Sequence, residues 1–486
     1  MSYKLIIRSL AVVSFVVSLV FLSALAVQCC CGLDWILIEK WVLCVAVALS
    51  IACGLCAASK NYEQNLFRKE ILAIIGLGLL IAVVIGTLPY LVFVGGCSPA
   101  TAFFESASGF TTTGATAFDD LSKLPSSLVF YRGMTQCIGG LITIFFFAIL
   151  LPIVGAKTKS ICMGGMCARP DETSFATINA IVKYTLGIYL TLTFSSMAVF
   201  CLGGMAKLDA FCYAAAIAST GGFSTATGDK IFIASDALQY FSIPVMAISG
   251  MNFICLMKIL RGDASELRTN EELRWYLYIL LSATALVTIF AAATRGHGTF
   301  GESLKTALFH VTSVVTTTGL ATPAMAKLSV AAQIVFISLM FCGGCSGSTA
   351  GGLKISRILI ILKSCVKNVR RSFRPNVVSS VFLNGKHVQP SEENETLGLA
   401  SLACATLIVF SFLLAMVTEN AGIGEIFHGA CSNFFNVGIN LFNQSTSYAV
   451  ATPSAKYLHG ALMLTGRVEM LAVVALLFPS FWKKPL

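Results

Sequence analysis

The sequence predicts an all-α polytopic membrane protein in which four pseudo-symmetric repeats surround one central pore, preceded by an N-terminal two-helix extension. Three observations predict this fold. Of the 486 residues, 56% are hydrophobic and only 12% are charged, about half the charge of an average soluble domain. Apolar runs long enough to cross a bilayer recur along the chain. Between them, a short helical segment that ends in a glycine turn recurs four times.

Ten apolar runs have about the length of 20 residues that a helix needs to cross a bilayer. They lie at 8–28, 37–57, 70–94, 130–153, 178–202, 238–259, 275–294, 330–363, 397–418 and 457–480. An even number of crossings places both termini on one side. That side carries 23 of the 33 Lys and Arg residues, the other side carries 9, and Arg467 lies within a span. The positive-inside rule therefore predicts cytoplasmic termini. The net charge of +10 thus reflects the basic residues on the cytoplasmic side, which also attract anionic lipids of the bilayer. It does not indicate a nucleic-acid partner.

Residues 1–64 are expected to form the two-helix extension. Lys4 and Arg8 precede the first apolar run, as they would in a secretory signal. Gln28, directly before Cys29, suits neither cleavage nor lipid attachment of that cysteine. The sequence thus favours a retained first helix.

The 18 cysteines do not indicate a disulfide framework, because most fall within the apolar spans, where cysteine acts as a small apolar residue. Cys29, Cys30 and Cys31 lie just outside the first helix and are candidates for pairing or modification. Cys162 and Cys167 have no histidine partners at metal-binding spacing. We therefore expect no resident metal site.

The four repeats are expected at 65–168, 169–268, 269–390 and 391–486. Each should contain a span, a half-helix, a glycine turn and a second span. We name the turns first to fourth; they read TTTGAT (111–116), STGGFS (219–224), TTTGLA (316–321) and FNVGIN (435–440). Aligning them places Gly114, Gly222, Gly319 and Gly438 in register, about a hundred residues apart.

The first half-helix shows why such a segment suits a cation. Ser98 is a good N-cap and Pro99 a good first helical residue, and the following stretch is long enough for only about three turns. Between two spans, such a segment must enter and leave by the same membrane face. The carboxyl end of its dipole and the carbonyl oxygens of the turn then face the pore axis. One glycine would merely cap a helix, but four in register favour a pore.

Hard oxygen ligands favour an alkali cation over soft metals as the transported ion. Threonine hydroxyls beside the glycines would add further oxygens. The predicted filter residues are Thr112, Thr113, Gly114, Thr220, Gly221, Gly222, Thr317, Thr318, Gly319, Asn436, Val437 and Gly438. Glu105, Asn433 and Asn436 are expected to support the filter backbone.

The segment GGCSGSTAGG at 343–352, which we call the interior loop, lies within the apolar stretch 330–363. Its glycines are Gly343, Gly344, Gly347, Gly351 and Gly352. Five glycines in ten residues should break a membrane helix, and broken backbone is tolerated only where protein or water satisfies it. The loop is thus expected to line the pore. The alternative is a cytoplasmic linker between two shorter helices.

Arg467 lies near the middle of the last predicted span. An arginine at that depth costs about 2.5 to 3.5 kcal/mol on insertion scales unless it faces a polar interior. We expect it to face the pore, with a structural ion pair as the alternative.

These motifs are similar to those of the Trk/Ktr/HKT superfamily of potassium and sodium transporters, and within it the chain resembles the bacterial TrkH type. Gln136, Gly139 and Gly140 in QCIGG also match, and the resemblance covers about residues 65–480. The matching segments are SGFTTTGAT (108–116), STGGFST (219–225), TTTGLAT (316–322), GGCSGSTAGGLKISR (343–357), NVGIN (436–440) and TGRVEM (465–470).

The resemblance implies a homodimer whose protomers each conduct, one filter glycine per repeat, the interior loop as a gate below the filter, and Arg467 as an electrostatic barrier. It also implies a cytoplasmic TrkA-type nucleotide-binding regulatory ring, for which the basic stretch 363–374 is the expected surface unless those charges only set topology. Glycine at position 114, where sodium-preferring plant members carry serine, favours potassium. The fourth turn departs from the threonine pattern at 435–437.

The sequence thus predicts potassium uptake across the bacterial inner membrane by an ion-conducting subunit, with a K⁺/Na⁺ or K⁺/H⁺ symporter of the same superfamily as the alternative. An enzyme is disfavoured: the five histidines form no HExxH motif, and there is no GxxxxGK[ST] or GxGxxG turn. The sequence GGCSGS also misses the GxSxG nucleophile pattern. We expect no bound organic cofactor.

Overall fold

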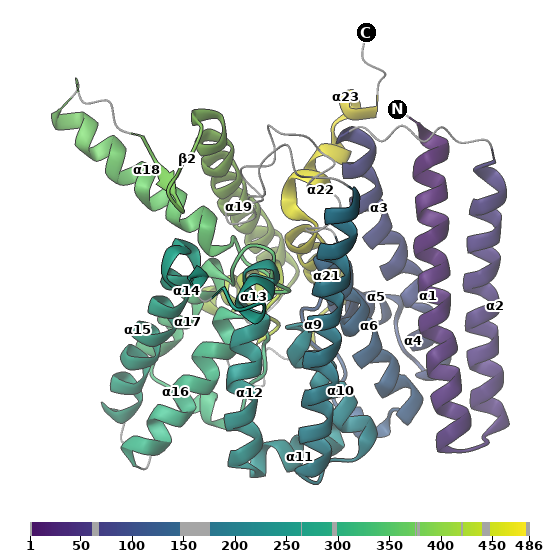
Figure 1. Ribbon diagram of the computed structural model, residues 1–486. Helices are drawn as coiled ribbons and strands as arrows, with labels where there is room; N and C mark the ends of the chain where they lie inside the picture. The colour runs from purple at the N-terminus through teal and green to yellow at the C-terminus, as the bar shows by residue number, and fades with distance from the viewer. Residues whose placement is uncertain are drawn as a thin grey trace.

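A computed structural model describes residues 2–60, 68–145, 175–263, 265–293, 299–374, 376, 380–418, 421–439 and 448–482. These residues are mostly helical, and they include one hairpin of strands β1 (Phe382–Leu383) and β2 (Lys386–His387). Within the described ranges, six helical segments are long and apolar enough to cross a membrane, and a bent pair would make a seventh. Figure 1 shows a bundle of roughly parallel helices, which confirms the predicted all-α class.

The N-terminal extension is a hairpin of α1 (Tyr3–Cys31) and α2 (Trp35–Ala58), as predicted. The Asp34 side chain accepts a hydrogen bond from the Ile36 backbone N–H and so caps α2. The buried Trp41 donates its indole N–H to Ser127 Oγ over 3.0 Å, which fixes the hairpin to the first repeat.

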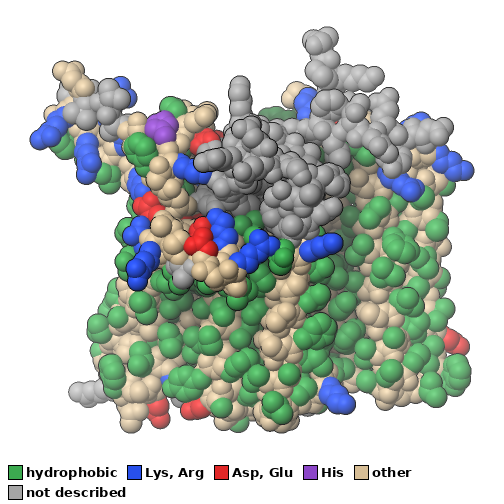
Figure 2. Space-filling model, in the orientation of Figure 1, with side chains coloured by type: hydrophobic (Ala, Val, Ile, Leu, Met, Phe, Trp, Pro, Cys, Tyr) green, Lys and Arg blue, Asp and Glu red, His purple; other side chains and the backbone are tan. Residues whose placement is uncertain are grey.

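Both ends of the described chain lie at the same end of the bundle (Figure 1). The Tyr3 hydroxyl donates to the Trp482 carbonyl over 2.9 Å, and the two rings stack. On the face in Figure 2, most Lys and Arg side chains gather at that same end, above a belt of hydrophobic side chains.

The first repeat contains α3 (Arg68–Gly86), α4 (Leu88–Phe93), α5 (Pro99–Phe110), the 3-10 turn η1 (Leu121–Lys123) and α6 (Ser126–Phe145). Helix α5 begins where the sequence predicts, because Ser98 Oγ accepts from the Thr101 N–H over 3.1 Å and Pro99 holds the first helical position. Its 12 residues span about 18 Å, well short of a bilayer core of about 30 Å.

The second repeat contains α9 (Phe175–Leu202), α10 (Lys207–Ala218), α11 (Ala226–Ala234), α12 (Asp236–Ser249) and α13 (Phe253–Leu260), followed by the short α14 (Glu266–Thr269). Helices α12 and α13 meet at an angle of 103°. Asn252 causes the break by capping α13, since its Oδ1 accepts from the N–H groups of Ile254 and Cys255. The span predicted at 238–259 is therefore bent into two helices instead of forming one continuous helix.

The third repeat contains α15 (Glu271–Ala293), α16 (Phe300–Val315), the 3-10 turn η4 (Pro323–Lys327), α17 (Val330–Cys342) and α18 (Ile355–Phe373). The predicted break in the stretch 330–363 is present, because α17 ends at Cys342 and α18 begins at Ile355. Beyond it, α18 projects from the bundle at the end that holds the termini (Figure 1).

The fourth repeat contains α19 (Pro390–Val417), α20 (Ile423–Phe434), α21 (Pro453–Arg467) and α22 (Glu469–Leu477), with α23 (Pro479–Trp482) at the end. The last predicted span is interrupted, since α21 ends at Arg467 and α22 starts at Glu469. The prediction that Arg467 lies at the centre of a continuous span was therefore wrong, because Arg467 is the last residue of α21.

Two large apolar cores surround three of the half-helices. One unites the third and fourth repeats through residues such as Tyr276, Phe336 and Val437. The other unites the extension with the first repeat and the last helices, through residues such as Trp41 and Met463. These cores enclose the half-helices α5, α16 and α20, and α10 is buried in two smaller clusters that include Tyr213 and Ala215. All four half-helices are thus covered by protein, as a re-entrant backbone requires.

Candidate functional site

The four glycine turns meet in a closed ring, although they are about a hundred residues apart in sequence. A Cβ added to any of their four glycines would overlap a backbone carbonyl oxygen of the next repeat. The clashing pairs are Gly114 with Gly221 O, Gly222 with Thr318 O, Gly319 with Val437 O, and Gly438 with Thr113 O. Each oxygen belongs to the residue just before a turn glycine, and the fourth turn closes onto the first. We call these glycines and carbonyls the glycine ring.

A Schellman motif ends each half-helix and forms each turn. The residue two positions before the glycine is left-handed in every repeat: Thr112 (φ 50°), Thr220 (54°), Thr317 (55°) and Asn436 (55°). The next N–H then donates to the carbonyl five residues back: Thr113 to Ser108, Gly221 to Ala216, Thr318 to Ser313 and Val437 to Ser432, over 2.7 to 2.9 Å. A left-handed conformation costs a non-glycine residue about 1–2 kcal/mol, so the repeated geometry is imposed by the surrounding packing. The turn glycines follow with φ between 72° and 86°.

A serine closes three of the four turns from within. Ser108, Ser313 and Ser432 stand six residues before their glycines, and each donates its hydroxyl to the carbonyl one residue after the glycine, over 2.6 to 2.8 Å. In the second turn the equivalent residue is Ala216, which has no hydroxyl to donate. The second turn must therefore be held in another way.

The threonine hydroxyls predicted as ion ligands also connect the turns to one another. Thr113 Oγ1 lies 2.7 Å from Thr111 Oγ1 and accepts from Asn436 Nδ2 over 2.9 Å, which joins the first and fourth turns. Thr318 Oγ1 lies 2.7 Å from Thr316 Oγ1. Among the described residues, the buried Thr112 Oγ1 has no hydrogen-bond partner.

Polar side chains on the half-helices hold the segments that leave the turns. The expected support from Glu105 is present, because its Oε1 accepts from the Ala117 N–H over 2.6 Å. His310 does the same in the third repeat, where its Nε2 accepts from the Thr322 N–H over 3.1 Å. We did not predict His310, although its register relative to Gly319 equals that of Glu105 relative to Gly114.

Among the described residues, the side chain of Asn433, also expected to support the filter, makes no hydrogen bond to the backbone of the fourth turn. Its Nδ2 lies 2.9 Å from the Tyr448 hydroxyl and 2.9 Å from His459 Nδ1, so it belongs to a buried cluster beside the turn. That prediction was wrong. Asn440, at the end of the fourth turn, lies outside the described residues.

The second helix of the first repeat packs directly on the turns because Gly139 and Gly140 face them. A Cβ on Gly139 would overlap the Phe110 carbonyl, and a Cβ on Gly140 would crowd Ser219. The QCIGG motif thus provides a close helix-to-turn contact.

The interior loop lies directly against this assembly. The Gly351 N–H donates to Thr317 Oγ1 over 2.7 Å, and a Cβ on Gly351 would overlap the carbonyl of Phe435. Thr349 Oγ1 bonds to the carbonyls of Ala218, at the end of α10, and Ser249, at the end of α12. The loop therefore contacts the second, third and fourth half-helices and is not an exposed linker.

Glycine shapes the interior loop at both of its ends. Gly343, Gly347 and Gly352 have φ of 64°, 75° and 78°. A Cβ on Gly343 would overlap the carbonyl of Gly351, so the two ends pack on each other. Gly344 likewise faces Ala350 with no room for a Cβ.

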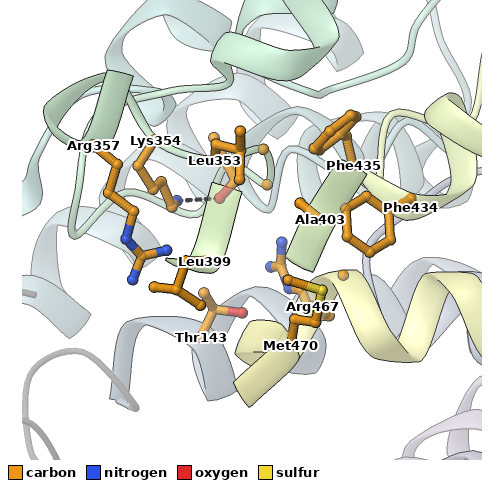
Figure 3. Close-up of a pocket in the computed structure, with 14 residues that line it drawn as sticks. Thr143, Leu353, Lys354, Arg357, Leu399, Ala403, Phe434, Phe435, Arg467 and Met470 are labelled. Carbon is orange, nitrogen blue, oxygen red and sulfur yellow. Dashed lines mark hydrogen bonds between the residues drawn. The ribbon is translucent and has the colours of Figure 1, made fainter. Parts of the chain in front are cut away.

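A cavity opens beside the interior loop and contains Arg467 (Figure 3). Gly351 and Gly352 line it, as do Lys354 and Arg357, and none of its described lining residues is acidic. The three guanidinium nitrogens of Arg467 are buried and have no hydrogen-bond partner among the described residues. Arg467 thus lines the same cavity as Gly351 and Gly352 of the interior loop, and none of the ion pairs among the described residues includes it.

No cluster of three His, Cys, Asp or Glu side chains suited to a metal is found among the described residues. Every cysteine that the structure describes is unpaired, including the exposed Cys29, Cys30 and Cys31. Cys162 and Cys167 lie outside those residues.

Comparison with known proteins agrees with this architecture. The family model TrkH, described as a cation transport protein, matches residues 172–484. The Trk system potassium uptake protein TrkH of Salmonella typhimurium is 29% identical over 444 residues, which cover 90% of this chain and 91% of that protein. TrkI of Halomonas elongata is 30% identical over 406 residues, covering 80% and 78%.

The fold is also that of a solved structure. The crystal structure of the potassium transporter TrkH from Vibrio parahaemolyticus matches with a TM-score of 0.88 at 25% identity, covering 99% of this chain and 100% of that one. Together with the family match, this similarity shows that the chain belongs to the TrkH family of cation transport proteins.

Proposed function

We propose that this chain is the ion-conducting transmembrane subunit of a bacterial potassium uptake system, located in the inner membrane with both termini in the cytoplasm. Its relatives are named as potassium uptake proteins. The observation that carries the proposal is the glycine ring, in which carbonyls from four repeats meet with no room for a Cβ. The shared end of the termini and the basic side chains gathered there support the orientation.

In this proposal, the glycine ring replaces the water around a passing K⁺ ion. The carboxyl ends of α5, α10, α16 and α20 lie beside the ring, and each contributes roughly half a negative charge from its helix dipole. The filter comprises residues 112–114, 220–222, 317–319 and 436–438. Carbonyl oxygens of the peptide chain are hard ligands that suit an alkali cation.

The interior loop is the proposed gate. It occupies the space against the third and fourth turns, so an ion that has left the ring can advance only if the loop moves. Arg467 beside it presents a buried positive charge, which raises the energy of a cation in the same cavity. Loop displacement and this charge together would set the flux.

A second candidate is a transporter of the same superfamily that moves K⁺ together with Na⁺ or H⁺. The fourth turn supports this second candidate. Asn436 stands where the other three turns have threonine, and its side-chain amide donates a hydrogen bond to Thr113 Oγ1. The ring is thus fourfold in backbone and not in side chains.

The test is flux through the purified protein in liposomes. Uptake of radioactive Rb⁺, a close analogue of K⁺, should exceed that of empty liposomes, and external K⁺ should compete much better than Na⁺. Flux that requires a Na⁺ or H⁺ gradient would favour the symporter. Absence of Rb⁺ flux from folded protein would refute both candidates.

We also propose a homodimer and a TrkA-type nucleotide-binding ring as partners, the ring docking on α18. In that helix, Lys363 lies 2.5 Å from Glu271 and Lys367 lies 2.5 Å from Glu393. Both lysines thus form ion pairs within the chain. Arg370 and Arg371 are exposed instead. Replacing both arginines with Gln should abolish co-purification of the ring, whereas Lys123→Gln at the opposite end should not. Unchanged binding of the ring would refute the docking surface.

A further inference from the structure

Helix α6 carries two buried polar side chains, Arg132 and Gln136, one helical turn apart. Neither belongs to the glycine ring, and packing of the fold does not require either to be polar. Arg132 is 2% exposed and Gln136 is fully buried. Burying an arginine is costly unless partners compensate it, and a buried amide must likewise be satisfied. Both side chains find their partners on the first and second turns.

Gln136 holds the second turn on both sides of its glycine. Its Nε2 donates to the Gly221 carbonyl over 2.6 Å, and its Oε1 accepts from the Phe223 N–H over 3.1 Å. Gly221 O is also the ring carbonyl against which Gly114 packs. The second turn is the one in which Ala216 replaces the serine that closes the other three turns. Gln136, from another repeat, thus closes the second turn through different atoms, the Gly221 carbonyl and the Phe223 N–H.

Arg132 connects the segments that leave the first and second turns. Its Nη2 lies 3.2 Å from Glu105 Oε2 and donates to Thr116 Oγ1 over 3.1 Å. Its guanidinium carbon lies 4.2 Å from the centre of the Phe223 ring, within cation–π distance. Glu105 in turn accepts from Thr116 Oγ1 and the Ala117 N–H. One face of α6 therefore fixes the outgoing segments of two turns relative to each other.

We propose that Glu105, Arg132 and Gln136 are positioning residues that determine how strongly the pore prefers K⁺ over Na⁺. The inference rests on the proposed function. Carbonyls discriminate between the two ions only while their spacing resists contraction around the smaller one. In the first, third and fourth turns, an internal serine bond opposes this contraction. In the second turn, the bonds of Gln136 oppose it. Arg132 and Glu105 keep the first and second turns at a fixed separation.

The test compares permeability ratios in liposomes or planar bilayers. Gln136→Leu removes both hydrogen bonds, and we expect the K⁺/Na⁺ permeability ratio to fall about tenfold while Rb⁺ flux persists, as for a loss on the scale of one or two hydrogen bonds. Gln136→Asn, too short to reach both partners, should lower the ratio similarly and serves if the leucine variant does not fold. Adding Ala216→Ser to Gln136→Leu should restore part of the ratio by rebuilding the internal closure.

A matched control is available in Gln239, a buried glutamine of α12 whose Nε2 donates to the carbonyls of Phe232 and Ile233, away from the ring. Gln239→Leu should leave the ratio unchanged. Glu105→Gln should lower the ratio about fivefold by weakening the charged pair with Arg132, and Glu105→Asp should lower it less.

The outcomes separate this inference from the proposed function. If the unmodified protein carries no Rb⁺, the proposed function fails. If it carries Rb⁺ selectively and Gln136→Leu or Gln136→Asn keeps the full ratio, the positioning role is overturned. An equal loss of K⁺ and Na⁺ flux at an unchanged ratio also overturns it, because a merely structural role predicts that result.

Discussion

The four turns of the glycine ring and the interior loop beside them both depend on left-handed glycines, and they are held in different ways. Each turn bonds to its own half-helix through a Schellman contact of 2.7 to 2.9 Å. The interior loop has internal bonds such as Ser348 Oγ to Cys345 O, and it is joined to other elements by further bonds. Cys345 N–H donates to Gly250 O, Ser346 N–H to Glu272, and Gly351 N–H to Thr317. Displacing a turn therefore breaks bonds to its own half-helix, whereas displacing the loop breaks bonds to several other elements.

This difference has an energetic scale. A net hydrogen bond is worth about 0.5–1.5 kcal/mol, so the polar contacts of the interior loop sum to a few kcal/mol. A ligand or partner can shift a two-state equilibrium of that size. The turns add strain at Thr112 and its equivalents to their internal bonds, and that strain is tolerated only if the surrounding packing is rigid. We therefore expect the glycine ring to stay rigid during conduction and the interior loop to be displaced.

The largest effect is expected from a methyl group placed in the ring. Gly222→Ala would bring a Cβ into the Thr318 carbonyl at φ 72°, so the ring cannot close. We expect Rb⁺ flux in liposomes to fall at least about 100-fold, since strain of roughly 3 kcal/mol or more must be relieved. The matched control is Gly398→Ala in α19, where nothing lies within 4 Å and alanine should favour the helix. Normal flux through Gly222→Ala would break the assignment of the ring.

A second substitution in the glycine ring should change its selectivity between K⁺ and Na⁺. Gly114 has φ 86°, and its Cβ position is occupied by the Gly221 carbonyl. Gly114→Ser should therefore displace one of the four carbonyls and add a hydroxyl, which favours the smaller ion. We expect the K⁺/Na⁺ ratio from reversal potentials to fall about tenfold. An unchanged ratio would count against position 114 as part of the filter.

Sequence alone predicted the parts of this site that repeat. Four glycines in register, the Ser98 cap and the glycine break at 343–352 are local signals, and each was found in place. The breaks at Val468 and near Asn252 were missed because apolar composition continues across them. The roles of Gln136 and His310 depend on contacts between distant segments, and such contacts leave no periodic pattern. Asn433 was misassigned because proximity in sequence to a turn does not tell which way a side chain points.

Removing the charge of Arg467 should sharpen the distinction between filter and gate. Arg467→Gln keeps a polar side chain in the cavity shared with Gly351 and Gly352 and removes the repulsion on cations. We expect Rb⁺ flux to rise about three- to tenfold, as for a barrier lowered by roughly 1 kcal/mol, with no change in the K⁺/Na⁺ ratio. Arg261→Gln, at an exposed arginine beside Tyr184, is the control for a lost positive charge. Equal or lower flux through Arg467→Gln would argue against a barrier.

The smallest effect on flux is expected from weakening the hydrogen bond that joins Glu272 to the interior loop. Glu272 is 1% exposed, and its Oε1 accepts from the Ser346 N–H over 2.6 Å. Glu272→Gln preserves the shape and an acceptor oxygen but removes the charge, and a charge-assisted hydrogen bond is about twice as strong as a neutral one. If the loop moves as a unit, basal Rb⁺ flux should rise about two- to fivefold, the effect of a contact weakened by less than about 1 kcal/mol.

The permeability ratio decides how that result is interpreted. It should stay constant in Glu272→Gln, because the Schellman contacts of the turns and their bonds to Gln136 and Asn436 do not involve the loop, which adds only one hydrogen bond, to Thr317. Glu266→Gln, which removes a carboxylate paired with Lys258 at 2.6 Å on nearby α14, should change neither flux nor ratio. A fall in the ratio for Glu272→Gln would mean that the loop helps to shape the filter, since the turns would then depend on a contact that the loop makes.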